Sequence, residues 1–190
     1  MLVDLLPRRV RRKLWRNDLG IYIQENSYSS GLELGVKAGR SMKAILKRNP
    51  SVKITGIDLW IDMPESSPYK KNSRKELFAQ KNIRKYKNAS LLKGDCLFLE
   101  NRIEDRSLDF IFYDLYDYRS SNVDFVKSVF EAYLPKLKSS GILIGRDFDQ
   151  LDVKHACKLL NLNDAKKCVI RNTPNPRLKY IVPKQGVKYQ

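Results

Sequence analysis

The residues between positions 31 and 60 predict a strand, a glycine-bearing turn, a helix and a second strand in succession. A short apolar run ends at Gly35, as expected for a strand buried in a parallel sheet. Gly39 closes the turn, residues 40–47 are apolar along one helical face, and Pro50 ends that helix. The second strand ends at Asp58. This order is typical of an α/β protein with a parallel sheet.

The spacing of Gly35 and Asp58 predicts a ligand site. In a parallel α/β sheet, ligands bind in the crevice outside the carboxyl ends of the strands. Gly35 carries no Cβ, so the backbone can approach a ligand closely at this position. Asp58 lies 23 residues after Gly35, near the offset of about 20 residues at which an acidic side chain meets ribose hydroxyls. A cofactor that contains a nucleoside is therefore expected.

The glycine pattern argues against the commonest nucleotide cofactors. Only G-x-x-x-G is present, and the chain has neither G-x-G-x-x-G nor a G-x-x-x-x-G-K-[ST] loop. Glu33, two residues before the first glycine, would repel a pyrophosphate and suits a cationic ligand. Residues 33–41, followed by residues 56–60, resemble motif I and the second-strand acidic residue of class I S-adenosylmethionine-dependent methyltransferases. The resemblance implies S-adenosylmethionine, a sulfonium cation, as the cofactor.

The rest of the chain continues the alternation of helices and strands. Further helices are expected at residues 69–86, 123–138 and 151–162, and further strands at 89–92, 107–113, 142–144, 167–171 and 178–182. On the first of these helices, Leu77, Phe78 and Ile83 are expected to face inward. A turn at residues 172–176 joins the last two strands, and so short a connection indicates an antiparallel hairpin.

The resemblance covers about residues 28–183 and implies the fold class. We expect an α/β, Rossmann-like, doubly wound and mostly parallel seven-stranded sheet with a C-terminal antiparallel hairpin. Residues 1–27 are expected to form an N-terminal basic helix or cap, and residues 28–190 the S-adenosylmethionine-binding methyltransferase domain.

The resemblance also implies which residues bind the cofactor. These lie at or near strand ends: Glu33, Gly35, Gly39, Ser41, Asp58, Leu59, Asp95, Cys96 and Asp114. Asp58 would hold the ribose, and Asp95 the adenine amino group. An alternative for Asp95 is that it caps a short helix beginning near residue 97.

Residues 108–149 resemble the small O-methyltransferases of the catechol and macrocin (sugar) types. In the metal-dependent members, acids after the fourth and fifth strands hold a divalent cation, which implies Mg²⁺ bound by Asp114 and Asp147. Two departures count against a metal, because Phe148 stands where an asparagine ligand is common and Asp117 where a lysine or histidine is common. In the alternative interpretation, Asp114 orients the amino-acid end of the cofactor and Asp147 caps the next helix.

Methyl transfer mainly requires that acceptor and cofactor are positioned correctly, because it is an in-line displacement at an activated methyl group. A base is needed only where the acceptor hydroxyl must lose its proton. Asp117 is the first candidate for this catalytic role, followed by Asp147 and His155. His155 is the only histidine and lies on an expected helix, where a surface position is the alternative.

The net charge of +16 predicts attraction to polyanions, and six basic residues fall between Arg8 and Arg16. The charge is nevertheless spread along the chain, which favours lysines that only solubilise the surface. The sequence contains no run of 18 apolar residues, so no transmembrane helix is expected. Three scattered cysteines suit a reducing compartment, and a cytoplasmic protein is expected.

These patterns together predict an S-adenosylmethionine-dependent methyltransferase that acts on an oxygen of a small or sugar-like acceptor. One alternative is a methyltransferase of RNA or another nucleic acid that uses the basic surface. Another is a methyltransferase-fold protein that binds the cofactor without turnover. Neither the acceptor nor the oligomeric state is indicated by the sequence.

Overall fold

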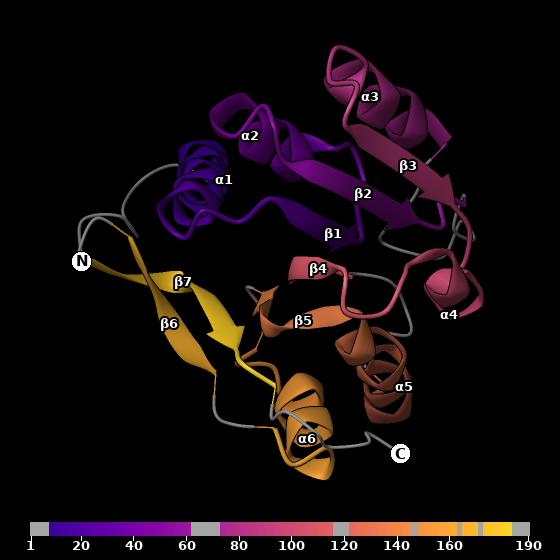
Figure 1. The fold of residues 1–190 in the computed structure, drawn as a ribbon, viewed down its shortest axis with the longest axis vertical. Coiled ribbons are helices and arrows are strands. Elements are labelled where there is room, and N and C mark those ends of the chain that lie inside the picture. The colour runs from indigo at the N-terminus through magenta and orange to yellow at the C-terminus, as the bar shows by residue number, and fades with distance from the viewer. Residues whose placement is uncertain are drawn as a thin grey trace.

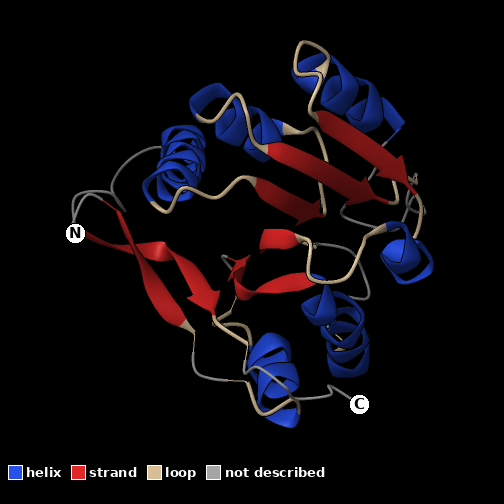
Figure 2. Ribbon diagram, viewed as in Figure 1, coloured by secondary structure: helices blue, strands red, loops and turns tan. Residues whose placement is uncertain are grey.

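The computed structural model describes residues 8–61, 73–115, 122–145, 148–162, 165–170 and 173–183. Within these ranges, seven strands form one sheet in the order β3-β2-β1-β4-β5-β7-β6 (Figure 1). Helices cover both faces of the sheet, with α1, α2 and α3 on one side and α4, α5 and α6 on the other (Figure 2). None of the helices in the described ranges is long and apolar enough to cross a membrane.

The helices and strands follow the expected order along the chain. They are α1 (Arg8–Glu25), β1 (Ser30–Leu34), α2 (Arg40–Arg48), β2 (Lys53–Asp58), α3 (Ser73–Ile83), β3 (Ala89–Lys93), α4 (Cys96–Leu99), η2 (Glu100–Arg102), β4 (Leu108–Tyr113), α5 (Val123–Tyr133), η3 (Leu134–Lys136), β5 (Leu137–Gly145), α6 (Leu151–Leu159), β6 (Lys166–Ile170) and β7 (Thr173–Ile181).

The strand order confirms the doubly wound sheet with a C-terminal hairpin. β1 pairs in parallel with both β2 and β4, while β7 pairs antiparallel with β5 and β6. The chain therefore reverses its direction of winding between β1 and β4, and a ligand crevice is expected at this point. There the amide of Asp114 donates to the carbonyl of Leu34 at 2.9 Å, which ties the carboxyl ends of the two strands together.

The core consists of two apolar layers, one on each face of the sheet. The longest helix, α1, belongs to the first layer, where Trp15, Leu19 and Ile23 are almost completely buried. The same helix packs against α2 and against β6 and β7. The mostly apolar residues 21–24 form the last turn of α1. The first helix of the chain thus contacts its last two strands.

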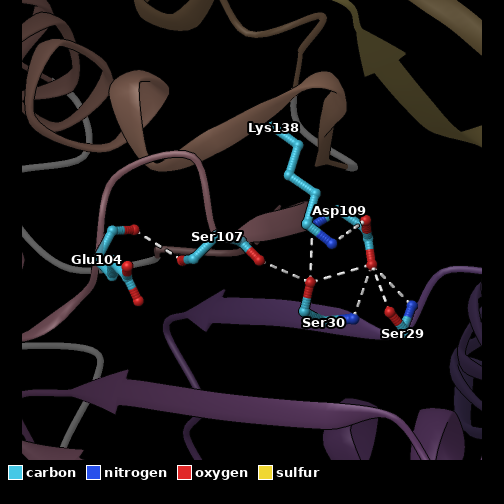
Figure 3. Close-up of polar contacts among 6 residues, drawn as sticks. All are labelled: Ser29, Ser30, Glu104, Ser107, Asp109 and Lys138. Carbon is cyan, nitrogen blue, oxygen red and sulfur yellow. Dashed lines mark hydrogen bonds and ion pairs between the residues drawn. The ribbon is translucent and has the colours of Figure 1, made fainter.

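A polar network joins the amino ends of three strands, at the edge opposite the expected crevice (Figure 3). Asp109 Oδ2 accepts from the backbone amides of Ser29 and Ser30 at 2.8 and 2.9 Å, and Asp109 Oδ1 accepts from Lys138 Nζ at 2.8 Å. The Ser30 hydroxyl lies 2.8 Å from the carbonyl oxygen of Ser107. One carboxylate therefore holds the beginnings of β1, β4 and β5 in register.

Two expectations about packing and strand length are wrong. Leu77 and Phe78 are 65% and 51% exposed, because α3 turns Ala79 and Ile83, four residues apart, towards the sheet. The expected turn at residues 172–176 lies largely in β7, which begins at Thr173. Only residues 179–181 of β7 pair with β5, so the two prolines of its first half lie where one side of the strand has no described partner.

Candidate functional site

The turn after β1 has a backbone that only glycine adopts without strain. Gly35 has φ of 90°, and its amide donates to the carbonyl of Ile57 at 2.9 Å. A Cβ at Gly35 would lie 2.3 Å from the carbonyl oxygen of Asp114, so β1 and β4 approach too closely for any side chain. Gly39, which caps α2, has φ of 65°. Both glycines of the predicted motif are therefore required by the geometry of the turn.

Asp58 joins this turn to the end of β2. Its Oδ2 accepts from the amide of Lys37 at 2.6 Å, and its Oδ1 accepts from the amide of Trp60 at 2.9 Å. The indole Nε1 of Trp60 in turn donates to the carbonyl of Lys37 at 2.6 Å. A carboxylate offers about four acceptor positions, so holding both loops is compatible with a ribose contact by the same group.

Lys37 and Trp60 are functional candidates that the sequence analysis missed. Both have positive φ, 54° and 42°, in the region that non-glycine residues rarely occupy. Trp60 is also 97% buried, since its exposed fraction is 3%. Strained backbone held by a buried side chain is common at ligand sites. The only sequence signal was a tryptophan two residues after the acid that ends β2.

Glu33 is the one acidic side chain among the described residues with an exposed fraction of zero. Its Oε1 accepts a short hydrogen bond from the hydroxyl of Ser41, and its Oε2 has no hydrogen-bond partner among the described residues. Burial raises the pKa of Glu33 well above its usual value, and the charges of Asp114 and Asp58 add to the rise. The Ser41 hydrogen bond and the charge of Arg16 act in the opposite direction. A buried, unsatisfied carboxyl oxygen of this kind favours a cationic or hydrogen-bond-donating ligand.

The end of β3 lies next to the end of β2. The amide of Gly94 donates to the carbonyl of Asp58 at 3.0 Å, and Asp95 follows directly. Asp95 caps α4 by accepting from the amide of Leu97 at 3.0 Å, which confirms the capping alternative. Cys96 is buried, and its carbonyl accepts from the hydroxyl of Tyr133. Asp58 and Asp95 thus stand at neighbouring strand ends, as the adenosine half of a cofactor would require.

The remaining predicted site residues differ in position and in exposure. Leu59 and Asp114 are half-buried and directly follow β2 and β4. His155 is exposed on α6. Asp117 and Asp147 lie outside the described residues, so their proposed roles as base and metal ligand stay predictions.

The magnesium interpretation finds no further support. Among the described residues, no group of three or more His, Cys, Asp or Glu side chains is arranged to hold a metal ion. Of the two predicted ligands, only Asp114 lies in the described part of the chain. Among the described residues, the buried acceptor at the end of β1 is a single carboxyl group bonded to a serine, which suits an organic cation.

No family model and no curated protein matches the chain, but solved structures match over nearly its whole length. CalS11, a TDP-rhamnose 3′-O-methyltransferase of calicheamicin biosynthesis, matches with a TM-score of 0.60 at 18% identity, over 96% of this chain and 83% of CalS11. The SAH-bound methyltransferase PaMTH1 from Podospora anserina matches with a TM-score of 0.61 at 16% identity, over 96% of this chain and 81% of PaMTH1. The N-methyltransferase NodS from Bradyrhizobium japonicum matches with a TM-score of 0.62 at 16% identity, over 93% of this chain and 97% of NodS.

These matches establish the fold. The chain has the fold of the class I S-adenosylmethionine-dependent methyltransferases, as the resemblance of residues 33–41 and 56–60 implied. CalS11 is described as a TDP-rhamnose 3′-O-methyltransferase and NodS as an N-methyltransferase, while the description of PaMTH1 names no acceptor, so the shared fold leaves the acceptor open.

Proposed function

We propose that this chain is an S-adenosylmethionine-dependent methyltransferase that methylates an oxygen of a small or sugar-like acceptor. The observation that carries the proposal is Glu33, a fully buried carboxyl group with one unsatisfied oxygen, directly before the strained glycine turn at the switch point of the sheet. When bound, S-adenosylmethionine supplies a methyl group already activated on a sulfonium. The neighbouring carboxylates Asp58 and Asp114 give the crevice the negative charge that such a cation needs.

Each residue of the crevice has a role that follows from its position. Glu33 and Asp114, at β1 and β4, receive the cationic amino-acid end of the cofactor. Asp58 accepts from the ribose hydroxyls while it holds Lys37 and Trp60 through their amides. Asp95 accepts from the adenine amino group at the next strand end. The glycine turn brings the ends of β1 and β4 together at the site, because a Cβ at Gly35 would meet the Asp114 carbonyl.

The chemistry at the acceptor requires little from the protein. A lone pair of the acceptor oxygen forms the new bond to the methyl carbon, the carbon–sulfur bond breaks, and the acceptor proton passes to a base or to water. Asp117 is our first candidate for that base, followed by Asp147 and His155. The sugar-like acceptor is favoured by the likeness to CalS11, whose described substrate is TDP-rhamnose.

Two measurements test this function in order. Calorimetry with S-adenosylhomocysteine is expected to show binding that Asp58→Ala weakens, because both the ribose contact and the loop tie are lost. Affinity unchanged by this substitution would remove Asp58 from the site. Transfer of labelled methyl from S-adenosylmethionine is then measured with nucleotide sugars, catechols and RNA as separate acceptors. Transfer to RNA alone would support the nucleic-acid alternative, and tight binding without any transfer would support a binding protein.

A further inference from the structure

A second concave site lies between α6 and β7, two strands away from the switch point between β1 and β4. It is a cavity of about 350 Å³ on the face of the sheet covered by α5 and α6. Its floor is apolar and includes Phe148, Cys157 and Ile181. A cavity of this volume is at the small end of the range for single small-molecule ligands, roughly 300–1,000 Å³.

The rim of the cavity is strongly basic. Lys154 and Lys158 project from successive turns of α6, and Lys179 comes from β7. The one acidic residue of the lining, Asp149, lies 2.5 Å from Lys179 Nζ and 4.0 Å from Lys154 Nζ. Lys158 is exposed and makes no ion pair with another residue of the described ranges. Among the described residues of the lining, one carboxylate therefore faces three lysines at the rim.

A fourth lysine adds to this excess of positive over negative side chains. Lys167 of β6 stands directly opposite Lys179 of β7, so two like charges form a cross-strand pair on one face of the hairpin. Such pairs destabilise a sheet. The hydrogen bond from Lys179, together with the charges of Lys154 and Lys167, holds the pKa of the exposed Asp149 below its usual value. Among the described residues, Lys167 and Lys179 thus share one carboxylate, and an anion would relieve the positive charge that remains.

We propose that this groove binds a small anion with an apolar body, namely an aromatic or aliphatic carboxylate or phosphate monoester. The apolar part lies on the floor formed by Phe148 and Ile181, and the anionic head lies against Lys158 and Lys179. A nucleic acid fits the same charge less well, because the site is a single short cavity with an apolar floor rather than an extended basic track. The proposal is independent of methyl transfer.

The test uses phenyl phosphate as the probe and phenol, which has the same ring without the charge, as its control. Amide chemical shifts of the ¹⁵N-labelled full chain are followed during titration to about 5 mM, which suits the millimolar affinity expected of so small a ligand. Shifts are expected at Cys157, Lys158 and Ala165 with phenyl phosphate, and weaker or absent shifts there with phenol. Equal shifts with phenol, or no shifts at these residues, would overturn the proposal.

Three variants sharpen the result. Lys158→Gln is expected to raise the dissociation constant by about threefold or more, as for loss of one charge-assisted contact. Ala165→Phe, which fills the cavity from the loop before β6, is expected to abolish binding. Lys53→Gln removes the same charge from an exposed position on β2 and should change nothing. If Lys53→Gln weakens binding as much as Lys158→Gln, the attraction is only the overall charge and the proposal is wrong.

A final experiment distinguishes a site for a small molecule from a surface that binds a polyanion. A single-stranded oligouridylate is titrated under the same conditions, with and without Ala165→Phe. If it shifts the groove residues with a steep salt dependence and Ala165→Phe has no effect, the lysines serve a polyanion surface and the small-anion proposal fails. Because Lys158→Gln changes only an exposed side chain, its result stands even if Ala165→Phe does not fold.

Discussion

The indole nitrogen of Trp60 donates to the backbone carbonyl of Lys37 at 2.6 Å, so the residue that follows β2 holds the turn that follows β1. Asp58 completes this arrangement by accepting from the amides of both residues. The two loops that frame the proposed cofactor site therefore form one bonded unit, and disturbing one loop disturbs the other.

Trp60→Phe tests that unit directly. The substitution keeps an apolar ring in the buried position but removes the indole donor, leaving the Lys37 carbonyl without this bond. Loss of one hydrogen bond of about 0.5–1.5 kcal/mol corresponds to a twofold to tenfold weakening of S-adenosylhomocysteine binding, measured by calorimetry. The control is Trp15→Phe, in the α1 layer of the core, which should lower the melting temperature without changing that affinity. Equal losses of affinity in both variants would mean that Trp60 acts through general stability.

Gly35→Ala is expected to be far more severe. The new Cβ would lie 2.3 Å from the Asp114 carbonyl oxygen on a backbone with φ of 90°, so the ends of β1 and β4 must separate. We expect a loss of at least about 2 kcal/mol in the free energy of unfolding, together with loss of cofactor binding. Urea denaturation and calorimetry check the two effects. Gly39→Ala is the graded comparison, because its Cβ would meet Ala79 only at 3.0 Å. A Gly35→Ala protein as stable as the wild type would contradict the close approach.

The buried carboxyl group of Glu33 is expected to lower the free energy of unfolding as the pH rises. Its folded pKa is raised well above the model-peptide value of 4.5, so the folded state binds its proton more tightly than the unfolded state. Below about pH 4 the carboxyl group is protonated in both the folded and the unfolded state and does not change the free energy of unfolding. Above that pH it ionises only in the unfolded state, so it destabilises the fold increasingly until it ionises in the folded state as well. Glu33→Gln should therefore unfold at higher urea concentration than the wild type at pH 7, by more than about 1 kcal/mol, and the difference should vanish near pH 4. A constant difference across this range would show that Glu33 is not protonated by burial.

The same substitution is expected to weaken cofactor binding. Glutamine keeps the shape of Glu33 but cannot give up a proton and become negative when a cationic amino group binds, so S-adenosylhomocysteine affinity should fall by about tenfold, or 1.4 kcal/mol. A variant that gains stability and loses ligand affinity is the signature of a buried group kept for binding. If affinity is unchanged, the carboxyl group serves only to accept from Ser41.

The carboxylate of Asp109 is expected to give the free energy of unfolding the opposite pH dependence. Burial alone would raise the pKa of Asp109, but the hydrogen bonds from Lys138 and from the amides of Ser29 and Ser30 outweigh it and hold the pKa well below its usual range. The resulting stability is present above about pH 4 and is lost as pH falls below that value. Asp109→Asn should destabilise the protein at pH 7 by about 1–3 kcal/mol in urea denaturation, and by less at pH 3. The control Glu104→Gln removes one carboxylate charge at an exposed position and should have little effect.

The sequence predicted the parts of the fold that depend on local pattern. Gly35 and Asp58 were identified from spacing alone, because a buried strand, a turn and an acid at a strand end have recognisable residues. Gly35 lies at the switch point, and Asp58 ends the neighbouring strand β2. The capping role of Asp95 was equally legible, since a short polar side chain before a helix accepts from its first amides.

What could not be read from the sequence depends on tertiary contacts. The bond from Trp60 to Lys37 joins a side chain to a backbone carbonyl 23 residues away, and no periodicity encodes it. The inward face of α3 was assigned to Leu77 and Phe78 because they are large and apolar, whereas the small Ala79 is what fits against Gly39. The candidate base Asp117 stays a prediction, since it lies outside the described residues.

The packing of α1 against β6 and β7 has a consequence for biosynthesis. Helix α1 leaves the ribosome well before β6 and β7, so its side that meets these two strands stays uncovered until β7 has been translated. Long-range contacts of this kind slow folding and prolong the exposure of apolar surface. That apolar side of α1 is therefore expected to be open to chaperones until β7 is available to cover it.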